Sequence, residues 1–139
     1  MDYYIEDFTE ANYKVILETL LSKGYKFVEF NYERITSDEN IVIWRHDVDF
    51  SLNRSCKLAE IEAELGIKAT YFIYVQSSFY NLFEPCQYEI IKRVNDLGHR
   101  IGLHFDHAFY TQSKQISDEK EIEECALMEK EMLENYCDI

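Results

Sequence analysis

The sequence has few of the residues that form linkers and tight turns. Among its 139 residues there are four glycines and a single proline. No Gly/Ser-rich linker, repeat or low-complexity tract interrupts the chain. The hydrophobic content of 47%, with 15% aromatic residues, differs strongly from the composition of disordered proteins. These features predict one globular domain spanning residues 1–139.

Basic residues are also scarce. The chain has 14 Lys and Arg against 27 Asp and Glu, which gives a formal net charge of −13. Such a charge repels a phosphate backbone, and the sequence contains no Lys/Arg cluster that could release counterions from one. We therefore expect no nucleic-acid partner.

Long apolar runs are missing as well. No stretch approaches the ~18 consecutive apolar residues that cross a bilayer. The N-terminal sequence MDYYIEDFTE lacks the basic start and apolar core of a signal peptide. The sequence therefore predicts no membrane association and a cytoplasmic location.

The cysteines do not form a recognisable pattern. Cys56, Cys86, Cys125 and Cys137 are widely spaced and include no C-x-x-C pair. A zinc knuckle and a dithiol redox motif are thereby excluded. We expect reduced thiols in or near the core.

Helical and strand patterns alternate along the chain. Helices are predicted from Thr9 to Gly24, Ser51 to Gly66, Pro85 to Gly98 and Ser117 to Tyr136. Strands are predicted at residues 25–30, 41–45, 69–75 and 99–105, with turn formers between residues 31 and 40. This alternation is typical of an α/β fold with a parallel sheet, in which functional groups gather at the C-terminal ends of the strands.

The first candidate site is the segment Arg45-His46-Asp47-Val48-Asp49, at the end of an apolar strand. In an extended segment Asp47 and Asp49 point the same way, and close like charges are unfavourable unless a cation or a proton separates them. The same alternation turns the His46 side chain away from Asp47, and Arg45 could orient Asp47 electrostatically. The structural alternative is that the pair only caps the next helix.

The second candidate site is GLHFDH, residues 102–107, at the end of the last predicted strand. If the chain turns after residue 105, His104 and His107 can converge. The structural alternative is a solvated loop. One carboxylate with two imidazoles leaves coordination positions open for water and substrate, as in catalytic metal sites. Two such motifs at the ends of strands in one parallel sheet predict a shared pocket.

At these residues the sequence resembles the polysaccharide-deacetylase (NodB-like) superfamily, whose members are metal-dependent amide hydrolases on an irregular (β/α) barrel. The resemblance covers residues 41–107. It rests on HDVD (46–49), KATYF (68–72) and GHRIG (98–102), the last of which leads to His104. It implies a partial or irregular (β/α) barrel with a parallel sheet.

The resemblance also implies roles for individual residues. Asp47 would be the general base, and Asp49 and His104 would be metal ligands. The family has a further histidine four residues after the first, where this chain has Ala108. His107 is therefore preferred as the third ligand, with Asp106 as the alternative. The implied metal is Zn²⁺, with Co²⁺, Ni²⁺ or Mn²⁺ as alternatives, and His99 is expected to support its strand.

The family's later motifs, an Arg/Trp groove wall and a Leu-x-His that supplies the general acid, have no counterpart after Tyr110. A complete (β/α) barrel needs ~250 residues. The domain is therefore expected to be truncated. The apolar stripe of the last helix could pack on the sheet or cover its open edge, and a homo-oligomer or a partner chain could complete the barrel.

The implied function is hydrolysis of a carbon–nitrogen bond other than a peptide bond, with deacetylation of an N-acetylated sugar or polysaccharide favoured. Ring amides and other small amides stay open as substrates. The main alternative is a catalytically inactive, truncated metal-binding or interaction module of the same fold. Phosphotransfer using Asp47 and Asp49 ranks last, because the sequence has no Gly-rich phosphate cradle.

Overall fold

The computed structural model describes residues 8–30, 40–137 and 139. Residues 1–7 and most of the predicted turn region 31–40 lie outside this description. The elements, in chain order, are α1 (Glu10–Ser22), β1 (Lys26–Val28), β2 (Ile41–Ile43), β3 (Arg45–Val48), α2 (Leu52–Glu64), β4 (Thr70–Ile73), α3 (Pro85–Asp96), β5 (Arg100–Leu103), the π-helix η3 (Phe109–Ser113) and α4 (Glu119–Cys137).

Local signals set the helix boundaries. The side chain of Thr9 accepts a hydrogen bond from the Asn12 N–H at the start of α1, and Ser51 caps α2 through the Arg54 N–H. Gly24 follows α1 at φ +80°, a left-handed conformation that glycine adopts without steric cost. The predicted helices are therefore confirmed, with ends shifted by a few residues.

All described strand pairs are parallel, which confirms the α/β class. β1 pairs with β2, and β3, β4 and β5 form a sheet in that order, with Asp47, Phe72 and Gly102 in register. The predicted strand at 41–45 divides at Trp44, after which β3 pairs with β4 instead of β1. The described strands do not close into a barrel.

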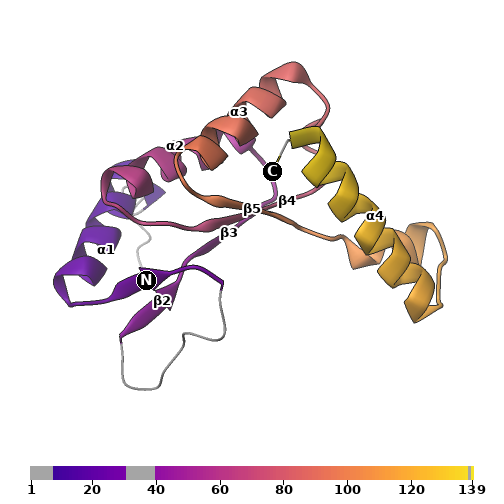
Figure 1. Ribbon diagram of the computed structural model, residues 1–139, viewed down its shortest axis with the longest axis horizontal. Coiled ribbons are helices and arrows are strands. Elements are labelled where there is room, and N and C mark those ends of the chain that lie inside the picture. The colour runs from indigo at the N-terminus through magenta and orange to yellow at the C-terminus, as the bar shows by residue number, and fades with distance from the viewer. Residues whose placement is uncertain (1–7, 31–39, 138) are drawn as a thin grey trace.

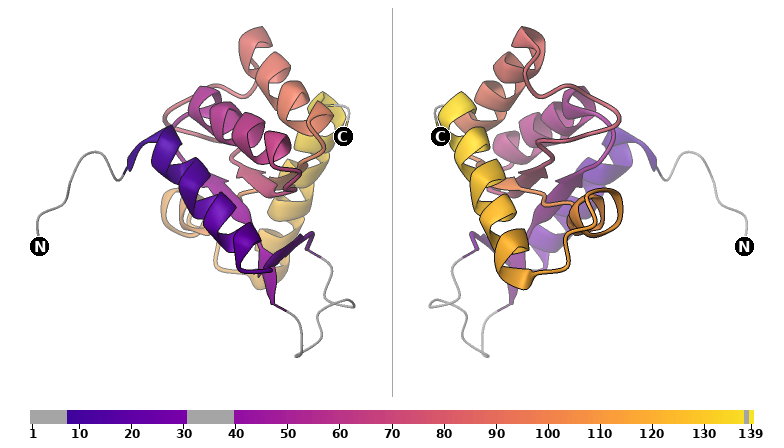
Figure 2. Two further views of the ribbon diagram at one scale, coloured as in Figure 1. Left: turned by 90° about the vertical axis from the view of Figure 1, so that its left-hand side faces the viewer. Right: turned by 90° about the vertical axis from the view of Figure 1, so that its right-hand side faces the viewer.

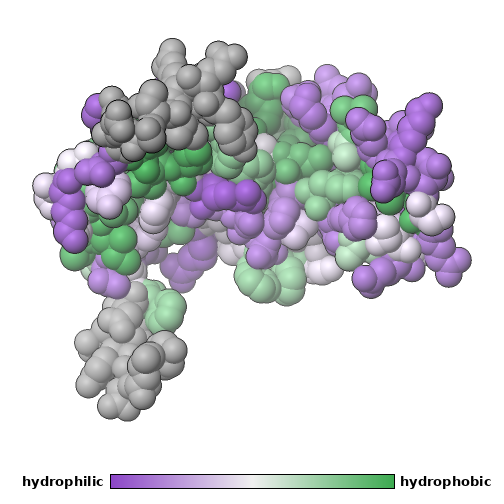
Figure 3. All heavy atoms as spheres, turned by 90° about the horizontal axis from the view of Figure 1, so that it is seen from below, coloured by the Kyte–Doolittle hydropathy of each residue, from purple (hydrophilic) through white to green (hydrophobic). Residues whose placement is uncertain are grey.

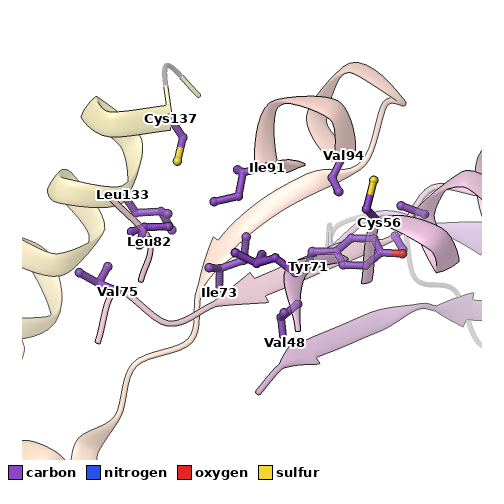
Figure 4. Close-up of a cluster of buried hydrophobic side chains, with 13 residues drawn as sticks. Val48, Cys56, Tyr71, Ile73, Val75, Leu82, Ile91, Val94, Leu133 and Cys137 are labelled. Carbon is purple, nitrogen blue, oxygen red and sulfur yellow. The ribbon is translucent and has the colours of Figure 1, made fainter. Parts of the chain in front are cut away.

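The helices lie mainly on one side of the sheet (Figure 1). α1 and α4 stand at opposite ends of it, as the two side views show (Figure 2). The core lies between the sheet and α2, α3 and α4, and its labelled members converge in Figure 4: Val48, Cys56, Tyr71, Ile73, Val75, Leu82, Ile91, Val94, Leu133 and Cys137. α4 packs onto the core, as one of the two predicted arrangements has it, but it does so through Leu133 and Cys137. Met128 and Met132, which belong to the predicted apolar stripe, are instead 48% and 39% exposed.

The other face of the sheet carries Arg45, Asp47, Phe72 and Gly102, since residues in register project to the same side. Arg45 and Asp47 are exposed there. Seen from below, hydrophilic and hydrophobic side chains intermingle over the sheet, while hydrophilic ones dominate the end formed by α4 (Figure 3). Over the described ranges, no helix has the length and hydrophobicity to span a membrane.

Candidate functional site

The structure brings Asp49 and His104 together from two strands that are not neighbours. Asp49 follows β3 and His104 follows β5, while β4 lies between them. The His104 backbone N–H donates to the Ile73 carbonyl at 2.9 Å, which continues the β4–β5 ladder to the histidine. As a result, Oδ1 of Asp49 lies 3.4 Å from Nδ1 of His104.

These two atoms are buried, and neither has a hydrogen-bond partner in the described structure. A buried polar atom without a partner costs about 1–3 kcal/mol, so a group bound between or beside the two atoms would stabilise this arrangement. Tetrahedral coordination at about 2.0–2.2 Å separates neighbouring ligand atoms by about 3.4 Å. The separation of Asp49 and His104 therefore suits two ligands of one divalent cation. A protonated His104 would instead form an ion pair with Asp49.

Tyr74 fixes the orientation of the His104 ring. The two rings stack with centroids 4.0 Å apart, and the Tyr74 hydroxyl lies 3.3 Å from Nε2 of His104. When Nδ1 is the atom that binds a metal, Nε2 carries the ring proton and donates a hydrogen bond to the Tyr74 hydroxyl. A hydrogen bond from the second ring nitrogen is usual for metal-binding histidines. Burial, followed by the charges of Asp49, Asp106 and Asp47, raises the pKa of Tyr74 above its ordinary value.

The Asp47 carboxylate is oriented by Arg45, which lies on the same strand. Arg45 donates to Oδ1 of Asp47 from Nη2 at 2.5 Å and from Nε at 3.1 Å, so the predicted contact between the two is present. The Arg45 guanidinium also lies 4.3 Å from the centroid of the Phe72 ring. Because the Asp47 side chain is 41% exposed, its carboxylate remains accessible to water.

Gly102 leaves space for the Phe72 ring on the open face of the sheet, which is the face opposite the helices. A Cβ at position 102 would lie 2.9 Å from two carbons of the Phe72 ring, closer than real side chains approach. The absence of a side chain thus lets Phe72 lie across β5 and support Arg45. Gly102 therefore determines the position of the Phe72 ring.

His107 lies apart from the pair. Its side chain is exposed at the start of the turn leading into η3, where its carbonyl accepts from the Thr111 hydroxyl. Asp106 accepts from the Phe109 N–H at 3.1 Å. Among the described residues, no group of three His, Cys, Asp or Glu side chains is close enough to hold a metal. The third ligand, whether His107 or Asp106, stays a prediction.

A pocket of about 290 Å³ opens beside Asp49. Its lining residues are Asp49, Phe50, Tyr74, Gln76, Ser77, Ser78, Phe79 and Asp106. Carboxylates, hydroxyls and aromatic rings therefore surround one solvent-accessible space next to the Asp49–His104 pair. This composition suits a polar, uncharged ligand of small size.

A buried carboxylate on the helix side of the sheet was not predicted from the sequence. Glu62 is fully buried and accepts hydrogen bonds from the hydroxyls of Tyr13 and Tyr71. His46 lies 2.6 Å from it, turned away from Asp47 as strand alternation predicted. Burial opposes ionisation of Glu62, but His46 and the two hydroxyls outweigh it and lower the pKa of Glu62. The sequence did contain a signal, because Glu62 lies three residues after Ala59 and therefore on the apolar face of α2.

His99 supports the strand, as expected. Its Nδ1 accepts from the Ala69 N–H at 3.2 Å, and its Nε2 donates to the Ala59 carbonyl at 2.9 Å. Burial lowers the pKa of His99, so the ring is held in its neutral form. Both ring nitrogens are engaged with backbone groups, which leaves neither for a metal.

The chain was compared with models of protein families, with curated proteins and with solved structures. No family model matches it, and no curated protein or solved structure is significantly similar to it. The function is therefore inferred from the residues of the site itself.

Proposed function

We propose that this protein is a metal-dependent hydrolase of carbon–nitrogen bonds other than peptide bonds, with deacetylation of an N-acetylated sugar as the favoured reaction. The observation that carries the proposal is the pair of buried, unpartnered atoms Asp49 Oδ1 and His104 Nδ1, 3.4 Å apart. Their separation and chemistry suit Zn²⁺, with Co²⁺, Ni²⁺ or Mn²⁺ as alternatives.

In this proposal Asp49 and His104 hold the metal, and His107 or Asp106 adds the third ligand. A bound divalent cation would polarise the amide carbonyl and acidify an attacking water. Asp47 would take the proton of that water, and Arg45 keeps its carboxylate oriented on the open face of the sheet. Tyr74 would maintain the His104 ring in the tautomer that leaves Nδ1 free.

We further propose that the fold is part of a (β/α) barrel of the polysaccharide-deacetylase (NodB-like) type. Three features support it: parallel strands alternating with helices, helices on one face of the sheet, and functional side chains at the C-terminal ends of β3 and β5. The open face that carries Asp47 would then correspond to the interior of the barrel.

A catalytically inactive metal-binding or interaction module is the second candidate. The exposed His107 and the lack of a three-ligand group among the described residues favour it. It shares the Asp49–His104 pair with the first candidate but requires no turnover. Metal binding therefore tests both candidates, and acetate release separates them.

The first experiment is calorimetric titration of the metal-stripped chain with Zn²⁺ and Co²⁺. We expect one-to-one binding that is lost in Asp49→Ala and His104→Ala and kept in Asp96→Ala, a control at the exposed end of α3. Loss in His107→Ala would identify the third ligand. A folded wild-type chain that binds neither metal would contradict the proposal.

The second experiment measures acetate release from N-acetylglucosamine oligomers by the Zn²⁺-loaded chain. Asp47→Asn should retain metal binding and lose acetate release, since it removes the proton acceptor and leaves the ligands in place. Metal binding by the wild type without any acetate release from sugars or simple amides would favour the inactive module.

A further inference from the structure

The long helix α4 buries one carboxylate that the candidate site does not use. Glu129 is 3% exposed, although most glutamates of this helix face solvent. A carboxylate loses several kcal/mol of hydration on burial unless hydrogen bonds replace the water. Oε1 of Glu129 accepts two such bonds, one from the Tyr110 hydroxyl at 2.7 Å and one from Nε2 of Gln76 at 2.7 Å. The carboxylate thus joins α4 to η3 and to the segment after β4.

The three side chains form a closed set of hydrogen bonds. Nε2 of Gln76 also lies 3.0 Å from the Tyr110 hydroxyl oxygen and donates to it. The amide nitrogen carries two hydrogens, so each of its donors has one acceptor. Burial, followed by the hydrogen bond to Glu129, raises the pKa of Tyr110, so the hydroxyl keeps the proton that it donates to Glu129. Every donor in the set is therefore satisfied.

These bonds decide which way the Gln76 amide faces. A reversed amide would place its oxygen against the Glu129 carboxylate, where two acceptors would meet without a hydrogen between them. Nε2 is therefore held on the buried side, toward Tyr110 and Glu129, and neither of these residues lines the pocket beside Asp49. Gln76 itself is exposed and does line that pocket. The polar atom that its amide offers to the pocket is Oε1.

The orientation of Gln76 determines the hydrogen-bonding character of the pocket. Asp49 and Asp106 are acceptors only when ionised, and Oε1 of Gln76 adds a neutral acceptor between them and the adjoining pocket of about 530 Å³, which Gln76 also lines. A ligand beside Gln76 must then supply an N–H or an O–H. A reversed amide would present two N–H donors instead and would favour ligands that carry only acceptors.

We propose that Glu129 is a positioning residue which, together with Tyr110, holds Gln76 with Oε1 toward the pocket beside Asp49. Gln76 thereby selects ligands that present a hydrogen-bond donor over ligands of the same shape that present only acceptors. This role goes beyond the proposed function, since it requires neither a metal nor turnover. It also gives α4 an influence on ligand choice, although no residue of α4 lines the pocket.

The test uses small lactams that differ in one donor and are small enough for a pocket of about 290 Å³. Pyrrolidone has a ring N–H, and N-methylpyrrolidone lacks it. A third compound, 5-methylpyrrolidone, adds the same methyl group elsewhere and keeps the N–H, so it controls for size. Affinities are measured by NMR titration of the isotopically labelled intact chain with a chelator present. Both N–H lactams should bind about fivefold or more tightly than N-methylpyrrolidone, as expected for one hydrogen bond.

Two variants and a control locate the effect. Glu129→Gln puts an amide at position 129 that can donate or accept, so Gln76 can take either orientation and the preference for N–H should fall below about twofold. Gln76→Met removes the acceptor and should have the same effect; because Gln76 is exposed, this variant keeps the test available if Glu129→Gln does not fold. Glu131→Gln, at an exposed position of the same helix, should keep the wild-type preference.

A second readout follows the Gln76 side chain directly. In the wild type its two amide hydrogens should exchange slowly with solvent, because both are donated to buried partners, and they should exchange faster in Glu129→Gln. If Glu129 only anchored α4, its replacement would lower stability and leave the preference among lactams unchanged.

The proposal is overturned by equal affinity for the N–H and N-methyl lactams, by a preference that survives in folded Glu129→Gln or in Gln76→Met, or by a folded wild-type chain that binds none of the three. Its failure is distinct from failure of the proposed function. Metal binding with no preference among lactams would leave the proposed function standing alone, whereas the preference without metal binding would leave only the role of Glu129.

Discussion

Removal of the negative charge of Glu62 should destabilise the protein although the residue lies outside the candidate site. Glu62 is fully buried on α2 and accepts hydrogen bonds from Tyr13 and Tyr71, with His46 at 2.6 Å. Trp44 extends the network, since its Nε1 donates to the Tyr13 hydroxyl at 2.7 Å. Glu62 thus links α1, α2 and two strands.

The expected loss of unfolding free energy follows from these contacts. Removing one partner of a buried, hydrogen-bonded charge network costs about 3–5 kcal/mol, and hydrogen bonds to charged groups contribute about 1.5–3 kcal/mol each. Glu62→Ala leaves two hydroxyls and an imidazole without their acceptor and should lose about 3–5 kcal/mol of unfolding free energy. Glu62→Gln keeps the volume and one acceptor oxygen and should lose about 1–3 kcal/mol.

Urea denaturation followed by tryptophan fluorescence and circular dichroism is the assay. Trp44 is the only tryptophan, and it lies within the network, so its fluorescence reports the local environment directly. The control is Glu64→Gln, which removes an exposed carboxylate on the same helix that pairs with Lys14 at 3.0 Å, and it should change stability little. If Glu62→Gln unfolds at the same urea concentration as Glu64→Gln, the charge of Glu62 does not stabilise the fold.

The pH dependence gives an independent check. The pKa of Glu62 is lowered from about 4.5 in the folded chain, so below that pH the unfolded chain binds more protons than the folded one. The contribution of Glu62 is therefore present above about pH 4.5 and is lost as the pH falls through its folded pKa. The Glu62→Gln variant should lose less stability over this range than the wild type.

Three further predictions concern the sheet and its histidines. Gly102→Ala should lower stability by about 1 kcal/mol or more, because the new Cβ displaces the Phe72 ring; an unchanged urea midpoint would contradict this. Tyr74→Phe should weaken Zn²⁺ binding by about tenfold or more in calorimetry, because the Nε2 of His104 loses its hydroxyl partner; equal affinity would exclude the role given to that contact. Because the pKa of the buried, neutral His99 is lowered from 6.5, wild-type stability should fall as the pH drops below that value; an NMR titration in which His99 shows an ordinary or raised pKa would refute it.

The sequence by itself determined the order and type of the main elements, because the signals are local. Thr9 and Ser51 accept hydrogen bonds from backbone N–H groups three residues ahead, and glycines after the helices take up positive φ. The alternation of strands and helices restricted the sheet to parallel pairing. It also indicated that the segments after β3 and β5 end on the same edge, which is why the pairing of Asp49 with His104 could be expected.

The side-chain geometry was decided by tertiary contacts between distant residues. The division of the strand at Trp44 depends on the change of partner from β1 to β4, and the buried position of Glu62 depends on Tyr13, 49 residues earlier in the chain. Spacing alone indicated that His104 and His107 could converge. In the structure His104 is held by Tyr74, whereas His107 begins a helical turn that leaves it exposed. A residue pattern within one segment reflects only the periodicity of that segment's own backbone. The direction in which a loop leaves a strand depends instead on the neighbouring elements against which the loop packs.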